Sequence, residues 1–440
     1  MSDTVKNSEI FCRKTAVDTP LTREEMRHAV STLFAPWRPR VKRLLIVPPD
    51  ITRANSGAGM LTRLIVAHAR ERQPGVHIDI LPALGTHAPM TDRERVEMFG
   101  DLPAPLFKVH NWRTGLVKLG EVPGTFVNEV SGGRLEYAIT VEISGIVAKG
   151  NYDLIASVGQ VVPHEVAGMA NGNKNIIVGT GGKDTINKTH FLGAVCNMET
   201  IMGRAENPVR SVFDFIEHRY LSSLHIAYIQ SVMSDFTTAR SGMAGLFVGT
   251  GGLPFREAAA LSRKVNITSL DTPLKKVVVY LDPREFKSTW LGNKAIYRTR
   301  MAMADGGELI VLAPGVEMFG EDVEIDRLIR KYGYRGTPAT LAAVTEHEEL
   351  RANRSAAAHL IHGSTEGRFS VTFAPGKLTR EEIEGVGFRF GDLKTLTAKY
   401  HSERLQPGMN TVDGEPVYFI RNPALGLWAT QQQFAADGGK

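Results

Sequence analysis

The feature that most constrains the fold is a repeated order of short apolar run, polar loop and amphipathic segment. The run KRLLIVPP at residues 42–49 ends in proline, continues as the polar loop DITRANSG, and leads into AGMLTRLIVAHARER. A second apolar run, VHIDILPA, follows at residues 76–83, and TDRE at residues 91–94 has the pattern of a capping box that opens another helix. Because buried strands that alternate with helices at this spacing are typical of parallel sheets, we expect an α/β fold.

The same order of elements recurs after residue 270. There LKKVVVYLDP predicts a strand, STWLGNKAIYRTRMAMA a helix, and GGELIVLAPG a turn followed by a strand. A chain of 440 residues is long enough for two such bodies. We therefore expect two α/β domains, residues 1–270 with the ligand-binding loops and residues 271–410, and a tail of residues 410–440 that can pack back on the first domain.

Composition excludes several classes of protein. The formal net charge of +5 comes from 52 basic and 47 acidic residues that are scattered without a basic stripe, so no nucleic acid partner is expected. Cys12 and Cys196 are too few for a disulfide framework or a thiolate metal cage. Neither a secretory signal nor an apolar run of membrane-spanning length occurs, which favours a cytoplasmic protein without a membrane partner.

Three loops that follow predicted strands contain the residues with chemical potential, at residues 48–57, 83–91 and 161–175. Ligands bind at the carboxyl ends of parallel strands, so these loops predict one site. The third loop continues into a glycine-rich segment that includes Lys174 and ends at His190. Taken singly, a histidine here is a hydrogen-bonded loop residue and a lysine or arginine is a solvated charge; their combination in three such loops indicates a site.

Two familiar motifs do not account for this site. Gly182-Lys183 resembles the end of a Walker A loop, but Ile177 replaces its first glycine and Asp184 replaces its serine or threonine. HEVAG begins like the H-E-x-x-H zinc motif, but Gly168 stands in place of the second histidine. Backbone amides of the glycine-rich turn could still bind a phosphate without Walker chemistry.

The segments DITR, GTHAPMT, PHE, GNKNI and NKTH together resemble the nickel-dependent lactate racemase family. The resemblance covers residues 40 to 375 and implies two α/β domains with the active site in the cleft between them. It also implies a nickel-pincer nucleotide, the pyridinium-3-thioamide-5-thiocarboxylic acid mononucleotide with bound Ni, which cofactor-synthesis enzymes would supply. Ser56 and Leu291 replace a proline and a glutamine that are common in the family, which leaves the substrate open.

The resemblance assigns roles residue by residue. Lys174, ten residues after His164, is implied to bind the pincer covalently, and His190, sixteen residues further on, to coordinate the nickel. His87 and His164 are implied to be the two catalytic acid/base groups. The remaining roles are cofactor contact for Asp50 and Thr52, and substrate binding for Arg53 and Lys294.

The residues fit this chemistry on independent grounds. Inversion at C2 of a 2-hydroxy acid by hydride removal avoids a carbanion but needs a cofactor, because no side chain accepts hydride. Two histidines could handle the hydroxyl proton from both faces, an arginine fork suits a carboxylate, and imidazole is a good nickel ligand. We therefore expect an isomerase, a racemase or epimerase of 2-hydroxy acids. The alternatives are a non-catalytic or cofactor-processing protein that binds a nucleotide-like anion, and a related hydride-transfer enzyme, such as a dehydratase or epimerase, on sugar acids.

The segment around Lys294 bears on substrate size. If TWLGNKAIYRTR forms one continuous helix, Trp290, Lys294 and Tyr297 share a face and Arg298 lies beside them. These side chains could line a pocket for an acid larger than lactate, or the aromatic ones could belong to the core while Arg298 and Arg300 are solvated. Both interpretations stay open at the level of sequence.

Overall fold

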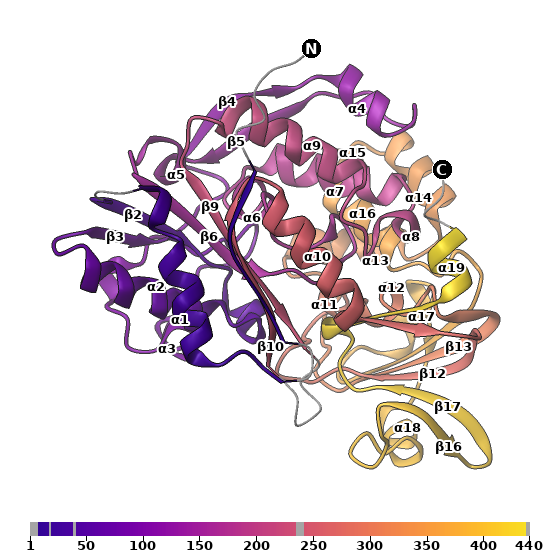
Figure 1. Cartoon of the computed structure of the whole chain (residues 1–440). Helices are drawn as coiled ribbons and strands as arrows, with labels where there is room; N and C mark the ends of the chain where they lie inside the picture. The colour runs from indigo at the N-terminus through magenta and orange to yellow at the C-terminus, as the bar shows by residue number, and fades with distance from the viewer. Residues whose placement is uncertain (1–7, 17–18, 38–40, 235–241, 437–440) are drawn as a thin grey trace. The chain divides into compact units, whose positions relative to one another are not determined.

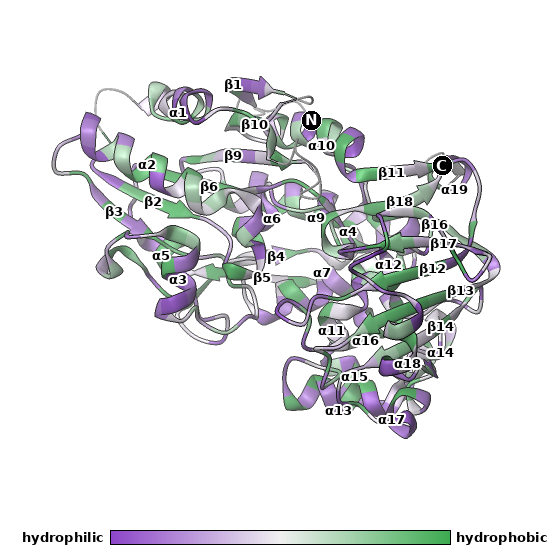
Figure 2. Cartoon of the chain, turned by 90° about the horizontal axis from the view of Figure 1, so that it is seen from below, coloured by the Kyte–Doolittle hydropathy of each residue, from purple (hydrophilic) through white to green (hydrophobic). Residues whose placement is uncertain are grey.

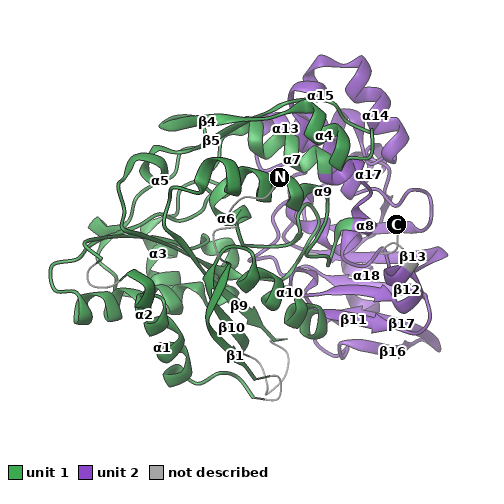
Figure 3. Cartoon of the chain, turned by 45° about the horizontal axis from the view of Figure 1, so that its top comes forward, with its two compact units in different colours: residues 1–192, 201–266 green, residues 193–200, 267–440 purple. Residues whose placement is uncertain are grey.

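Alternating strands and helices build two units in the computed structural model of this protein (Figure 1). The structure describes residues 8–16, 19–37, 41–234 and 242–436. The first unit comprises Met1–Leu192 and Ile201–Asn266, and the second comprises Gly193–Thr200 and Ile267–Lys440 (Figure 3). The predicted α/β class is confirmed.

A six-stranded sheet in the order β1-β10-β9-β6-β2-β3 forms the centre of the first unit. Its strands are β1 (Glu9–Thr15), β2 (Arg43–Val47), β3 (His77–Ile80), β6 (Leu154–Gln160), β9 (Ile226–Met233) and β10 (Met243–Thr250). Strands β3, β2, β6 and β9 are parallel, β10 runs antiparallel to β9, and β1 runs antiparallel to β10 at the edge of the sheet. The carboxyl ends of β2, β3 and β6 therefore lie at the same edge of the sheet.

Helices and two small antiparallel sheets complete the first unit. The helices are α1 (Arg23–Thr32), α2 (Ala58–Arg72), α3 (Asp92–Phe99), α4 (Gly124–Val130), α5 (Gly145–Lys149), α6 (Lys174–Ile177), α7 (Lys183–Val195), α9 (Pro208–Ile216) and α10 (Leu253–Asn266). One small sheet pairs β4 (Leu116–Val122) with β5 (Ile139–Ser144), and the other is the hairpin of β7 (Pro163–His164) and β8 (Gly168–Met169). The predicted capping box is present, because Thr91 accepts from the amide of Glu94 while the Glu94 carboxylate accepts from the amide of Thr91.

The apolar runs form these strands because the sheet is covered on both faces. Leu44, Leu45, Ile46 and Val47 in β2 are all fully buried, as expected for a parallel strand between two layers of helices. Figure 2 shows the same strongly hydrophobic colour along β2 and along the central strands of the second unit. A continuous apolar run, rather than an alternating one, is thus the sequence signal that located the sheet.

The second unit has its own six-stranded sheet, in the order β15-β14-β13-β12-β17-β16. Its strands are β12 (Leu274–Tyr280), β13 (Met303–Ala313), β14 (Ser370–Pro375), β15 (Arg389–Phe390), β16 (Gly408–Val412) and β17 (Glu415–Ile420). A separate parallel pair joins β11 (Ile267–Leu270) to β18 (Leu427–Thr430). The C-terminal segment thus contributes β16 to β18 to the second unit. The sequence alone also allowed packing of this segment on the first domain.

The helices of the second unit are mostly short. They are α8 (Met198–Ile201), α11 (Thr289–Gly292), α12 (Lys294–Tyr297), α13 (Val323–Tyr332), α14 (Thr337–Glu346), α15 (Glu348–Ala352), α16 (Arg354–His362), α17 (Arg380–Gly385), α18 (Leu393–Lys399) and α19 (Gln431–Ala436). Helices α7 and α8 carry the chain between the two units, so each includes residues of both. Within the described part of the chain, no helix combines the length and the apolar character needed to cross a bilayer.

The prediction of one continuous helix at STWLGNKAIYRTRMAMA is wrong. Two helices of one turn, α11 and α12, are separated at the buried Asn293, and the segment then enters β13 at Met303. Gly292 packs so closely on Leu281 that a Cβ there would lie 2.9 Å from a side-chain methyl. Local contacts of this kind override helical propensity, which is a weak determinant over so few residues.

Gly59 provides a test of the packing between α2 and α3. A Cβ at Gly59 would lie 1.9 Å from the backbone oxygen of Met98 at the end of α3. We expect Gly59→Ala to lower the free energy of unfolding by about 1–3 kcal/mol, the usual cost of overpacking, with a lower urea midpoint. The control Gly385→Ala, at a glycine with no atom within 4 Å of its added Cβ, should change it by less than about 0.5 kcal/mol. Equal urea midpoints for the two variants would contradict this packing.

Candidate active site

Three loops meet at the carboxyl edge of the first sheet. The loop after β2 is joined to the loop after β3 by a parallel bridge between Pro49 and Ala83. The loop after β6 returns to β2, because Asn175 Nδ2 donates to the backbone oxygen of Val47 at 2.9 Å. The strand order therefore brings together the three loops in which the sequence predicted a site.

Asp50 and His87 form a hydrogen-bonded pair between the first two loops. Asp50 is 4% exposed, and its Oδ2 lies 2.5 Å from Nδ1 of His87. Its Oδ1 accepts from the amide and the hydroxyl of Thr52, at 3.1 and 2.5 Å. Burial alone would raise the pKa of Asp50, but the bonds from His87 and Thr52 and the charge of Arg53 together lower it. Since an ionised carboxylate can only accept, Nδ1 of His87 carries a proton and the lone pair of its neutral ring is on Nε2.

Lys174 begins helix α6 and lies among charged side chains. Burial lowers the pKa of its ammonium to about 8; the charges of Arg53 and Arg210 act in the same direction, and that of Glu165 opposes them. A lysine with a pKa this low is partly neutral near pH 7.5, and only the neutral amine is a nucleophile. The lysine that the sequence predicted as the attachment point is thus chemically activated.

His190 lies on α7 in a form suited to metal binding. Its Nδ1 is 2.6 Å from the backbone oxygen of Ile186, one turn earlier, so Nδ1 is the protonated nitrogen and Nε2 carries the lone pair. Burial, followed by the charge of Lys174, lowers the pKa of His190 to about 4. A histidine that donates one ring N–H to a carbonyl and presents the other nitrogen is the usual state of a metal ligand.

His164 has the opposite arrangement of protons. It is 5% exposed in the β7–β8 hairpin, and its Nδ1 accepts from the backbone amides of Val166 and Ala167 at 3.1 and 3.4 Å. When the ring is neutral, its proton is therefore on Nε2. His87 presents a lone pair at Nε2 whereas His164 presents an N–H there, so the two predicted catalytic histidines are not equivalent.

Lys294 belongs to the second unit, where its ammonium lies 5.4 Å from the ring centroid of Phe286. Tyr297 is 4% exposed, which supports its interpretation as a core residue, whereas the expectation of solvated arginines is wrong, because Arg298 and Arg300 are 0% and 5% exposed. Trp290 is half-buried, with its ring centroid 4.5 Å from that of His359. The role of Lys294 toward a substrate stays a prediction.

Two charged residues of the site were missed from the sequence. Glu165 acts electrostatically on both Lys174 and His190, although it was considered only as part of a failed zinc motif. Its place directly after a predicted catalytic histidine is the signal that could have identified it. Arg210 also acts on Lys174 but comes from α9, and nothing in the local sequence marks it.

Comparison with known proteins gives a consistent result. Residues 7–203 match the family model described as the lactate racemase N-terminal domain. A solved structure of a protein from Thermotoga maritima is similar, with a TM-score of 0.80 and 22% identity over 94% of this chain and 99% of that chain. The lactate racemase apoprotein from Thermoanaerobacterium thermosaccharolyticum has a TM-score of 0.68 and 16% identity over 94% and 91%. No curated protein sequence matches the chain.

The low pKa of His190 predicts a pH dependence of stability. The unfolded state binds a proton near pH 6.5 and the folded state only near pH 4, so the folded state loses stability as the pH falls through this window. We expect His190 to account for up to about 3 kcal/mol of the free energy of unfolding, and this contribution is fully present above pH 6.5. Denaturant unfolding of the cofactor-free protein and of His190→Gln at several pH values measures it. The loss between pH 6.5 and 4 should be smaller in the variant, and equal losses would disprove the assignment.

Proposed function

We propose that this chain, whose residues 7–203 match the lactate racemase N-terminal domain, inverts C2 of a 2-hydroxy acid as a racemase or epimerase. The observation that carries the proposal is the pair Lys174 and His190. They interact electrostatically, and both have pKa values low enough to present a neutral amine and a neutral imidazole near neutrality. Such a pair suits the binding of an electrophilic, metal-bearing group better than it suits a structural role.

The donor set fits a nickel-pincer nucleotide. Lys174 would bind it covalently through its amine, and Nε2 of His190 would complete the coordination of the nickel. When bound, this cofactor supplies the hydride acceptor that side chains cannot provide. Arg53, whose charge acts on Lys174, would hold the carboxylate of the substrate with its guanidinium fork.

His87 is the residue that we propose takes the proton from the 2-hydroxyl group. Its Nε2 lone pair is maintained by the bond from Nδ1 to Asp50. Asp50 also stabilises the imidazolium that forms when the proton is taken, as a buried carboxylate does in serine hydrolases. Asp50 and Thr52 were predicted to contact the cofactor; since Asp50 bonds both Thr52 and His87, we propose that Asp50 also positions the base.

His164 is proposed as a hydrogen-bond donor to the C2 oxygen. Two backbone amides occupy its Nδ1, so a neutral His164 has no lone pair on Nε2 with which to act as a base. An Nε2–H near the substrate would instead stabilise negative charge on the C2 oxygen. This assignment supports one proton carrier, His87, and one donor in place of the two bases expected from sequence. Lys294 remains proposed as a second substrate-binding cation.

Covalent attachment at Lys174 is directly testable. The chain is produced with the cofactor-synthesis enzymes, and intact mass should show a nucleotide-sized adduct that is absent from Lys174→Ala. Elemental analysis should find nickel in the wild type and much less in His190→Ala, which lacks the metal-binding imidazole. Conversion of single-enantiomer 2-hydroxy acids, followed by chiral chromatography, then separates a racemase from a protein that only binds the cofactor. An adduct that persists in Lys174→Ala would rule out this attachment site.

The two histidines should respond differently to glutamine. His87→Gln cannot take a proton near neutral pH and should reduce turnover by about 10²–10⁴. His164→Gln keeps an N–H donor and should lose less than about tenfold, whereas His164→Ala should lose more. Turnover in both directions, measured on protein with equal nickel content, provides the comparison. If His164→Gln were as inactive as His87→Gln, His164 would be a base and the proposed donor role would be wrong.

A further inference from the structure

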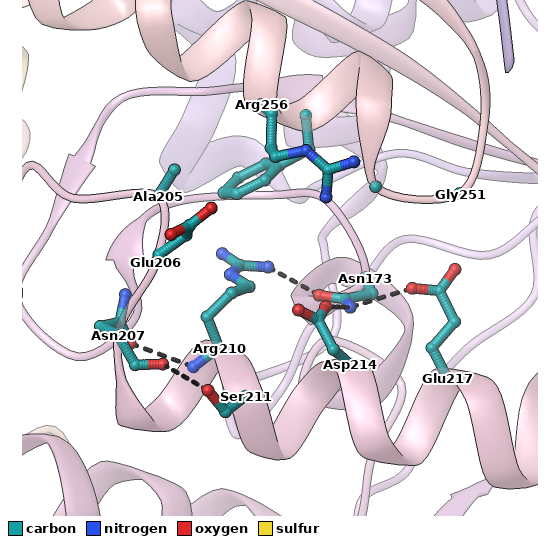
Figure 4. A pocket seen from close by; sticks show the side chains of 12 residues that line it. Asn173, Ala205, Glu206, Asn207, Arg210, Ser211, Asp214, Glu217, Gly251 and Arg256 are labelled. Carbon is teal, nitrogen blue, oxygen red and sulfur yellow. Dashed lines mark hydrogen bonds between the residues drawn. The ribbon is translucent and has the colours of Figure 1, made fainter. Parts of the chain in front are cut away.

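The residue before Lys174 is fixed by a buried polar network that the proposed chemistry does not use. The network lines a cavity of about 270 Å³ between α9, the π-helical turn Glu217–Leu221 and the start of α10. Figure 4 shows the side chains that line this cavity and the hydrogen bonds among them. Asn173 Oδ1 accepts from Arg210 at 2.6 Å, while its Nδ2 donates to Asp214 at 2.7 Å and to Glu217 at 2.9 Å. Every polar atom of the Asn173 side chain therefore has a charged partner.

Arg210 holds the whole loop rather than one residue of it. Its guanidinium donates to the backbone oxygens of Met169 at 2.7 Å and Asn171 at 3.2 Å, in addition to Asn173. The side chain is 4% exposed and lies 4.0 Å from the ring centroid of Phe255. Burial lowers the pKa of Arg210 to about 10, so it stays charged at neutral pH. One guanidinium thus spans residues 169 to 173.

The carboxylates determine which way the amide of Asn173 faces. Glu217 also accepts from the hydroxyl of Tyr228 at 2.6 Å, and burial raises its pKa. With Arg210 donating on one side and two carboxyl groups accepting on the other, the amide cannot flip without losing all three bonds. Its orientation is therefore fixed by electrostatics.

The main chain carries this constraint to Lys174. The backbone oxygen of Asn173 accepts from the amides of Ile176 and Ile177 at 3.1 and 3.0 Å, which forms the first turn of α6. Lys174 is the first residue of that turn, so the direction of its side chain depends on how Asn173 is held. We infer that Arg210 and Asn173 are positioning residues that hold the amine of Lys174 in the orientation and surroundings in which it reacts. This inference deepens the proposed function, because it assumes that Lys174 is the attachment residue.

The test uses the cofactor-free chain and two substitutions that change the network in different ways. Arg210→Lys keeps the positive charge but cannot span three acceptors, and Asn173→Leu keeps the shape but loses all three bonds. Arg256→Lys is the matched control, because Arg256 is an exposed arginine that lines the same cavity. The pH profile of acetic anhydride labelling at Lys174 is read by peptide mass spectrometry, with the exposed Lys183 as internal reference.

In the wild type the labelling midpoint of Lys174 should fall near its pKa of about 8. In Arg210→Lys and Asn173→Leu it should rise by about one pH unit or more toward the ordinary lysine value of about 10.4, because the amine becomes more solvated and moves away from the charge of Arg53, the two effects that lower its pKa most. Hydrogen exchange should also become faster in residues 172–178, while the other peptides of the first unit stay unchanged. Arg256→Lys should behave as the wild type.

Two results would overturn the inference. One is a labelling midpoint in both variants within about 0.3 pH units of the wild type, well below the shift expected when a partly buried lysine becomes solvated. The other is faster exchange throughout the first unit with an unchanged midpoint, which would show a role in stability alone. Neither result depends on the cofactor: absence of an adduct on wild-type Lys174 would refute the proposed attachment and leave the labelling result unaffected.

Discussion

The parallel pairing of β2 with β3 on one side and β6 on the other is the constraint on which the site depends. Parallel strands end at the same edge, so three loops distant in sequence must meet there. The bond of Asn175 to β2 and the bridge of Pro49 to Ala83 then hold those loops against one another. Asp50 can reach His87 across 37 residues only because the strands before them are neighbours.

Much of the fold could be predicted because burial on both faces leaves a strong signal. The runs in β2, β12 and β13 are continuously apolar, and the capping boxes at Thr91 and Thr379 mark helix starts by local chemistry alone. The prediction of one continuous helix around Asn293 was wrong because the local sequence there holds no comparable signal. The two one-turn helices of this segment are separated at the buried Asn293, and the neighbouring Gly292 packs closely on Leu281; tertiary contacts of this kind leave no local pattern in the sequence.

For the site, residue types and spacing identified the candidates but not their protonation states. The tautomer of His164 depends on two backbone amides of its own hairpin, and that of His190 on a carbonyl one helical turn away. Glu165 and Arg210 escaped notice because their importance lies in where their charges act, on Lys174 and, for Glu165, also on His190. The hydrogen-bond partners of a histidine, which only the structure shows, therefore decide whether it can act as a base or as a hydrogen-bond donor.

Helix α7 carries the metal-ligand candidate and leads the chain from the first unit into the second. His190 lies in the part of α7 that belongs to the first unit, whereas the chain from Gly193 to Thr200 groups with the second. There the buried carboxylate of Glu199 accepts from Arg300 at 2.8 Å and from Arg368 at 3.3 Å. Removing one partner from such a buried ion pair leaves an uncompensated charge, so this end of the segment is strongly held. Glu199 belongs to α8, which follows the end of α7 at Val195, so this ion network stabilises the second unit and not the loops that carry the chemistry.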